Sequence, residues 1–175
     1  MPSSFSALKY RARGEANIGG IASILVFSTE DLTAEWPTKA VIASGKITTL
    51  PPFVTGKFPA TLTGDIDSAN IKHARKGALG YQNHSHEGGV KFAGISAEQI
   101  TAAEATFNTG GIVIAIDMEG RRWVLGSRLR PLTFEYDTQT GAKADDAKQL
   151  DLKFKGDGYA WPILELTDTL VIPTA

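Results

Sequence analysis

"QLDLKFKG", residues 149–156, alternates between apolar and charged side chains from Leu150 to Lys155. Its apolar side chains are Leu150, Leu152 and Phe154, and its charged ones are Asp151, Lys153 and Lys155. Because successive side chains of a β-strand point to opposite faces, this alternation predicts a strand with one buried face. The other face would lie in water or against a neighbour, which is typical of an antiparallel sheet.

Strand patterns continue throughout the chain. Apolar runs occur at 21–28 ("IASILVFS") and at 111–117 ("GIVIAID"). The turn-forming "MEGR" joins the second run to "RWVLGS", residues 122–127, so these two segments predict a β-hairpin. The predicted fold class is therefore mainly β, an antiparallel β-sandwich or barrel.

One segment has a helical pattern instead. In "SAEQITAAEATF", Ser96 is followed three residues later by Gln99, which is the spacing of a capping box. Three apolar side chains would share one stripe of the helix: Ile100, Ala103 and Phe107. Gly110 and Gly111 supply a stop, so the sequence predicts one packed α-helix over about residues 96–108.

The chain length of 175 residues fits one domain. We expect residues 1–175 to form a single β-sandwich domain, with an N-terminal arm at 1–18 and a C-terminal arm at 167–175. Pro51 and Pro52 cannot donate to a sheet ladder, so their loop should lie at an edge or project from the body. "GDG", residues 156–158, predicts a hairpin turn.

Composition excludes several classes of function. The formal net charge of -1 gives no indication of a protein that wraps nucleic acid by neutralising phosphates. Without cysteine there can be no disulfide, iron–sulfur cluster, thiolate zinc site or cysteine nucleophile. The longest apolar runs are strand-sized, far short of the roughly 20 residues of a membrane span, so no membrane partner is expected.

A metal site is suggested by "GYQNHSHEGGVKF", residues 80–92. On a strand His84 and His86 point to the same face and could share a metal ion, whereas Glu87 points to the other face. A catalytic zinc or iron also needs a third protein ligand, and His73 is an ambiguous candidate. We therefore interpret His84 and His86 as packing or subunit-contact residues and predict no metal and no cofactor.

No catalytic residues are predicted. Asp117 ends an apolar run before a turn, where an aspartate commonly stabilises the turn itself. The serines form no nucleophile elbow, and no phosphate-binding loop is present. Four arginines surround Trp123 and are interpreted as a solvated strand face rather than a phosphate-binding surface: Arg121, Arg122, Arg128 and Arg130. The sequence thus indicates a protein that is not an enzyme.

The order of these elements resembles the tail tube (major tail) proteins of tailed bacteriophages. The resemblance covers residues 19–30 and 92–166 and is carried by "GGIASILVFSTED", the helix, "GIVIAIDMEGRRWVLGS" and "LDLKFKGDGYAWPILEL". Residues 38–87 match no part of this pattern.

The resemblance implies a structural virion protein with a β-sandwich flanked by a helix. Six copies would form a ring, and stacked rings would form a tube through which DNA passes without specific binding. The implied partners are further copies of the chain and other tail proteins. The implied location is the virion tail, assembled in the host cytoplasm.

Contacts between rings are expected from the N-terminal arm and from two apolar segments. These segments are Pro51, Pro52 and Phe53, and Val171, Ile172 and Pro173. Three alternatives stay open: another ring component of the tail or neck, a monomeric β-barrel that binds a small ligand, and a metalloenzyme using His84 and His86.

Overall fold

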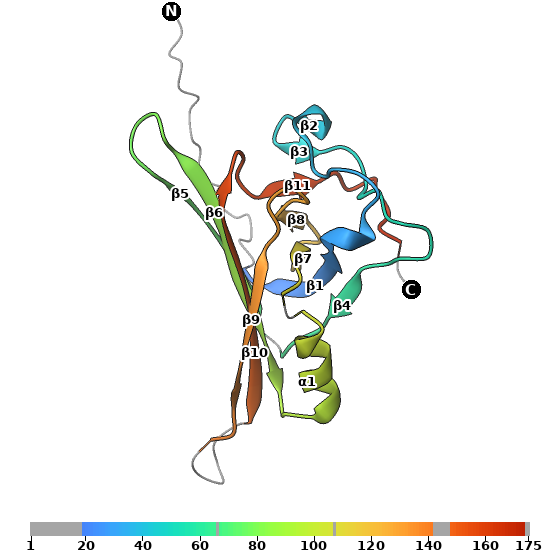
Figure 1. Cartoon of the computed structure of the whole chain (residues 1–175), viewed down its shortest axis with the longest axis vertical. Coiled ribbons are helices and arrows are strands. Elements are labelled where there is room, and N and C mark those ends of the chain that lie inside the picture. Colours follow the sequence, from blue (N-terminus) through green and yellow to red (C-terminus); the bar gives the residue numbers. More distant parts are fainter. Residues whose placement is uncertain (1–18, 66, 107, 142–147, 174–175) are drawn as a thin grey trace, which may run out of the picture.

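In the part of the chain that the structure describes, two sheets and one α-helix confirm the predicted fold class (Figure 1). A computed structural model describes residues 19–65, 67–106, 108–141 and 148–173, and these contain one α-helix, α1 (Ala97–Glu104). The expected N-terminal arm, 1–18, lies outside these ranges. No helix in them has the length and apolar character to cross a membrane. Two short 3₁₀ turns, η1 (Thr29–Asp31) and η2 (Lys39–Val41), follow the first strand.

The larger sheet has seven strands. In spatial order they are β2 (Ile42–Ala43), β3 (Lys46–Ile47), β11 (Leu164–Leu166), β8 (Arg122–Leu125), β7 (Gly111–Asp117), β1 (Ile21–Ser28) and β4 (Ala60–Leu62). β7, an interior strand of this sheet, is buried from Gly111 to Ala115, which explains its continuous apolar run. β7 and β8 form the predicted hairpin.

The smaller sheet has four strands, all antiparallel to their neighbours. Its order is β5 (Asn70–Lys76), β6 (Asn83–Ala93), β10 (Gln149–Tyr159) and β9 (Thr133–Gln139). Leu150, Leu152 and Phe154 of β10 are buried, and Lys153 and Lys155 between them are exposed. The alternation at 149–156 thus predicted both the strand and its orientation.

The hydrophobic core has two parts, one on each face of the larger sheet. Between the two sheets, Val113 and Leu125 pack with Leu152 and Phe154 of β10. On the other face, the buried side chains of β1, β7 and β8 are covered by the segment that follows β1, which includes Leu32 and Trp36. That segment therefore belongs to the body of the domain.

The helix begins as predicted and ends earlier. Ser96 accepts a hydrogen bond from the Gln99 amide, and the Gln99 side chain accepts one from the Ser96 amide, which completes the capping box. The helix ends at Glu104 rather than near residue 108, with Ala105 as its C-cap, and Asn108 with a left-handed φ of 53° lies in the turn that follows. Phe107 lies outside the described residues.

The predicted turn at "GDG" is wrong. β10 continues through residues 156–158 to Tyr159, and its register against β6 shifts between Asp157 and Tyr159. Gly158, with a φ of 82°, supplies the extra residue of a β-bulge there. Gly156 is required for a different reason, because an added Cβ at this position would lie 2.1 Å from the Tyr159 hydroxyl oxygen.

Residues 38–87, which matched no pattern, contain a long hairpin. Strands β5 and β6 pair along their length and extend beyond the body of the domain (Figure 1). Gly77 closes the tip with a φ of 107°, and a Cβ at this position would lie 2.5 Å from the Tyr81 carbonyl oxygen. The tip exposes two large apolar side chains, Leu79 (94%) and Tyr81 (83%).

Candidate assembly interface

His86 is a packing residue. Its Nδ1 accepts the Gly126 amide at 3.2 Å, and its Nε2 lies 3.3 Å from the Trp161 carbonyl oxygen, so the proton resides on Nε2. Burial, with repulsion from His73 and His84, lowers the pKa of His86 to about 4 although the Trp161 hydrogen bond opposes the shift. Both ring nitrogens are engaged with the backbone, which leaves none for a metal ion.

His84 instead contacts His73. The His73 Nε2 and His84 Nδ1 atoms are 2.8 Å apart, and the two rings stack with 5.0 Å between centroids. Burial and repulsion from His73 and Arg75 lower the pKa of His84. Within the described ranges, no three histidine, aspartate or glutamate side chains are arranged to hold a metal ion.

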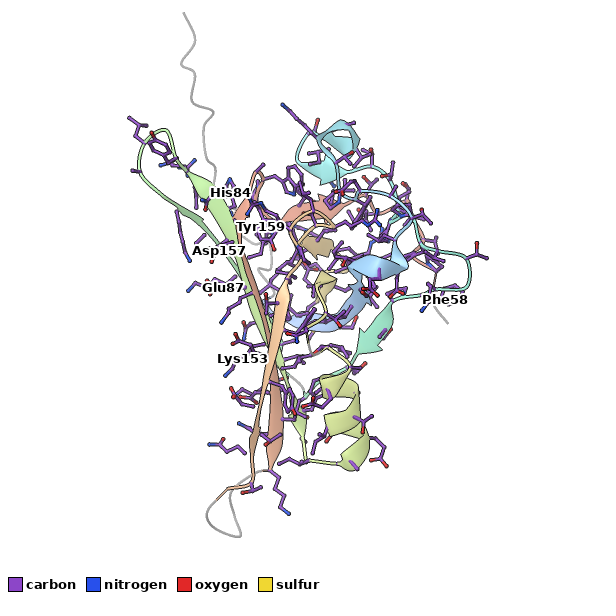
Figure 2. The ribbon with its side chains drawn as sticks, viewed as in Figure 1. Phe58, His84, Glu87, Lys153, Asp157 and Tyr159 are labelled. Atoms are coloured by element: carbon purple, nitrogen blue, oxygen red, sulfur yellow. The ribbon has the colours of Figure 1, made fainter. Side chains whose placement is uncertain are left out.

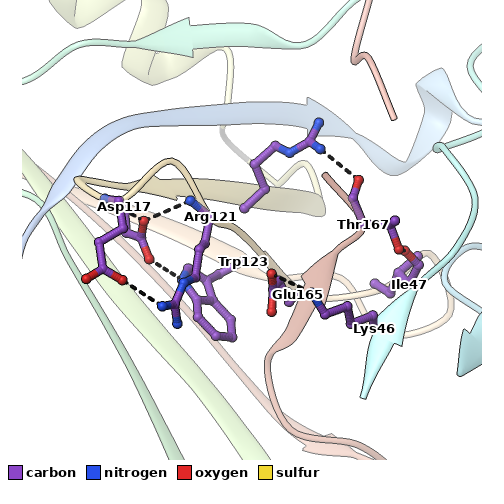
Figure 3. Close-up of polar contacts among 9 residues, drawn as sticks. Lys46, Ile47, Asp117, Arg121, Trp123, Glu165 and Thr167 are labelled. Carbon is purple, nitrogen blue, oxygen red and sulfur yellow. Dashed lines mark hydrogen bonds and ion pairs between the residues drawn. The ribbon is translucent and has the colours of Figure 1, made fainter. Parts of the chain in front are cut away.

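Asp117 organises the turn between β7 and β8 (Figure 3). Its Oδ1 accepts the amides of Glu119 and Arg121, each at 2.9 Å, and its Oδ2 accepts the Trp123 indole N–H at 2.9 Å. Burial alone would raise the pKa of Asp117, but these hydrogen bonds and the Arg121 charge lower it. The aspartate therefore stabilises the turn, as its position in the sequence indicated.

The side chain of Arg122 holds the first part of the C-terminal segment against the domain. The Arg122 guanidinium donates to the carbonyls of Thr167, at 2.7 Å, and Leu170. Ile172 packs against the second core cluster, while Val171 is 81% exposed. The expected subunit contact at Val171, Ile172 and Pro173 stays a prediction, and Ile172 is half-buried against its own domain.

The Pro51–Pro52–Phe53 segment is likewise largely covered by its own domain. Pro51 is buried, Pro52 and Phe53 are half-buried, and Phe53 meets Phe27 edge to face with 5.0 Å between ring centroids. The exposed apolar residues of this loop come later, at Val54 and Phe58. The expected subunit contact at Pro51, Pro52 and Phe53 stays a prediction, and Pro52 and Phe53 keep part of their surface exposed.

The outer face of the smaller sheet carries balanced charge. Figure 2 shows Glu87, Lys153 and Asp157 pointing away from the body on this face. The strand register places five basic and five acidic side chains there: Lys72, Lys76, Lys91, Lys153, Lys155, Glu87, Glu135, Asp137, Asp151 and Asp157. Cross-strand pairs join them, including Lys153 with Asp137, Lys155 with Glu135, and Lys91 with Asp151.

Both edges of the smaller sheet are open among the described residues. β5 pairs only with β6, and β9 pairs only with β10, so each seven-residue edge strand has one ladder partner. The charges of the two edges are opposite. β5 carries Lys72, Arg75 and Lys76 and no acid, whereas β9 carries Glu135 and Asp137 and no base. Sequence reasoning missed this pair of edges because it needs the strand order.

An apolar pocket of about 360 Å³ lies between α1 and the two sheets. Its lining includes Phe58, Leu62, Phe92, Ala102, Phe134 and Leu152. The volume falls within the range of small-molecule pockets, roughly 300–1,000 Å³. Comparisons of the chain with protein-family models, with curated proteins and with solved structures found no match.

Proposed function

We propose that this protein is a structural subunit that assembles into rings through the edges of its smaller sheet, and that stacked rings form a bacteriophage tail tube. The observation that carries the proposal is the opposite charge of β5 and β9. These are the two edge strands of a single sheet, so each copy carries both halves of one interface.

The geometry of the edges suits such pairing. Three antiparallel ladders separate β5 from β9, so the two edges run in opposite directions. A copy related by rotation about an axis along the strands would bring its β9 antiparallel to β5 of its neighbour. Opposite charges facing each other across strands contribute roughly 0.2–1 kcal/mol per pair. Like edges would repel, which favours head-to-tail order around the ring.

Closure of the ring would also protect the edges. A long open edge strand is a template for uncontrolled pairing with other chains. An interface between two different surfaces of the same subunit gives a ring when the rotation closes and a filament when it does not. A closed ring leaves no open edge in this sheet.

The balanced outer face supports a lumen through which DNA slides. Dense lysine and arginine would hold phosphates by releasing their counterions, and each such contact would slow the passage of DNA. Here five lysines and five carboxylates share the same surface, and cross-strand pairs join several of them. The resemblance of residues 19–30 and 92–166 to tail tube proteins supports the same assignment, with other ring components of the tail or neck as the nearest alternatives.

One observation favours a second candidate, a monomeric protein that binds a small ligand. The apolar pocket beside α1 has a suitable volume and lining. In this alternative the two edge strands would stay unpaired in solution. Organic extraction of the purified protein followed by mass spectrometry would then find one ligand per chain.

Negative-stain electron microscopy with light scattering, over a concentration series, tests the proposed function. We expect the scattering mass to rise from that of one chain to that of a ring, and rings or hollow tubes to appear on the grids. A constant monomer mass with no assembled particles at the highest soluble concentration would contradict the proposal.

A further inference from the structure

We propose that the tip of the β5–β6 hairpin of one copy inserts Leu79 and Tyr81 into the apolar pocket beside α1 of a second copy. The inference rests on the self-assembly proposed above and names the contact that would stack one ring on the next. Three features support it: the exposure of the tip, the chemistry of the pocket and the charges around each.

The large apolar side chains at the hairpin tip are almost fully exposed. Leu79 and Tyr81 are the two most exposed large apolar side chains described, at 94% and 83%, and they lie two residues apart. The tip projects beyond the body of the domain (Figure 1). A pair of large apolar side chains at the end of a projecting arm is suited to insertion into a neighbour.

The pocket has the complementary chemistry. Aromatic and aliphatic side chains from both sheets form its walls, including Phe92, Phe134 and Leu152. Phe58 and Ala102 line it and are exposed, so it opens to the surface between the 54–58 loop and α1 (Figure 2 labels Phe58). Its volume of about 360 Å³ can receive apolar side chains without displacement of the core.

Charges around the two surfaces are of opposite sign. From Ser68 to His86 the hairpin contains Lys72, Arg75 and Lys76 and no acidic residue. The two elements beside the pocket, η1 and α1, carry four acids and no base: Glu30, Asp31, Glu98 and Glu104. Lys57 pairs with Asp31, and the other three carboxylates of η1 and α1 would attract a basic hairpin.

The placement of the two surfaces requires a second copy. The hairpin tip and α1 lie toward opposite ends of the longest axis of the molecule (Figure 1). The tip cannot reach the pocket of its own chain, whereas a copy displaced along this axis brings them together. Such a contact joins different surfaces, so it repeats from copy to copy and produces a stack.

Disulfide trapping tests the contact directly, because the chain has no cysteine of its own. Leu79→Cys and Ala102→Cys are made in separate full-length chains, mixed, and oxidised under the conditions of assembly. Leu129→Cys, at a 76% exposed apolar site, is mixed with Ala102→Cys as the matched control. We expect a reducible dimer from Leu79→Cys with Ala102→Cys at least tenfold above the control mixture and above each variant alone.

The outcomes separate this contact from the proposed function. If rings or tubes form but no trapped dimer is found, the hairpin contact is overturned and the proposal of ring assembly still holds. A trapped dimer without rings would support the contact and contradict the tube. A stoichiometric apolar ligand extracted from the assembled wild-type protein would overturn the contact, because the pocket would already be occupied.

Discussion

The imidazole of His86 lies flat on the phenol ring of Tyr159, with 4.1 Å between the ring centroids and 5° between the planes. This contact joins β6 to the end of β10, where the bulge at Gly158 shifts the register. Burial raises the pKa of Tyr159 to about 12, so both rings are neutral near pH 7. The histidine that suggested a metal site is therefore part of the core.

Replacing His86 with glutamine should reduce the pH dependence of stability between pH 6.5 and 4. The folded-state pKa of His86 is about 4, below the ordinary histidine value of 6.5. The unfolded chain therefore binds a proton that the folded chain does not, and stability falls as the pH decreases through this window. The loss attributable to His86 is up to about 3 kcal/mol.

Urea unfolding at several pH values measures this effect. His84→Gln is the matched control, since His84 is less buried and its pKa is also lowered. His86→Gln will lower stability at pH 7, because its shape differs from that of imidazole. Equal slopes of stability against pH in the wild type and in His86→Gln would show that His86 is not the group responsible.

Asp117→Asn should lower the free energy of unfolding by about 1–2 kcal/mol. The side-chain oxygen of asparagine can still accept the amides of Glu119 and Arg121. Its side-chain nitrogen, which replaces Oδ2, cannot accept the Trp123 indole N–H, so that hydrogen bond is lost. The lowered pKa of Asp117 contributes stability that is present above pH 3.8 and is lost as the pH falls below it. Asp157→Asn, an exposed carboxylate on β10, is the control and should change stability little. Thermal unfolding of both variants at pH 7 makes the comparison, and an equal Tm shift would refute the role given to Asp117.

Neighbouring substitutions on β10 test the two faces of the smaller sheet. Leu152→Ala removes a buried side chain and should cost about 2–5 kcal/mol of unfolding free energy. Lys153→Ala removes an exposed side chain with a surface ion pair and should cost less than about 1 kcal/mol. Urea denaturation measures the loss of unfolding free energy in each variant. Similar losses in the two variants would contradict the assignment of buried and outer faces.

Local patterns predicted part of this fold correctly. The alternation at 149–156 requires only the period of a strand, and the Ser96–Gln99 capping box requires only four consecutive residues. The "GDG" segment was misinterpreted because its glycines serve different purposes: Gly156 leaves room for the Tyr159 ring, and Gly158 forms the bulge. Neither requirement is visible without the position of Tyr159.

The hairpin and the edges could not be predicted from the sequence. In β5 only Ile71 is strongly apolar, so "NIKHARK" has no hydrophobic alternation to mark it as a strand. Its residues are ordered by pairing with β6 rather than by their own burial. The opposite charges of β5 and β9 suggest an interface only once both strands are known to be edges of one sheet.

The central claim, that copies join through β5 and β9, is tested most directly by charge reversal of each edge. One chain carries Lys72→Glu with Arg75→Glu, and the other carries Glu135→Lys with Asp137→Lys. Each alone would place like charges at the interface and should raise the concentration needed for assembly at least tenfold, which corresponds to about 1.4 kcal/mol. Lys39→Glu with Arg128→Glu, away from both edges, is the control and should assemble like the wild type.

The decisive measurement is light scattering of the two edge-reversed chains mixed in equal amounts. Each edge of one then meets an edge of opposite charge on the other, so the account predicts that the mixture recovers the assembled mass of the wild type. Recovery also requires the two chains to alternate, which only a ring with an even number of subunits allows. A mixture that stays monomeric while the wild type and the control assemble would contradict pairing through these edges.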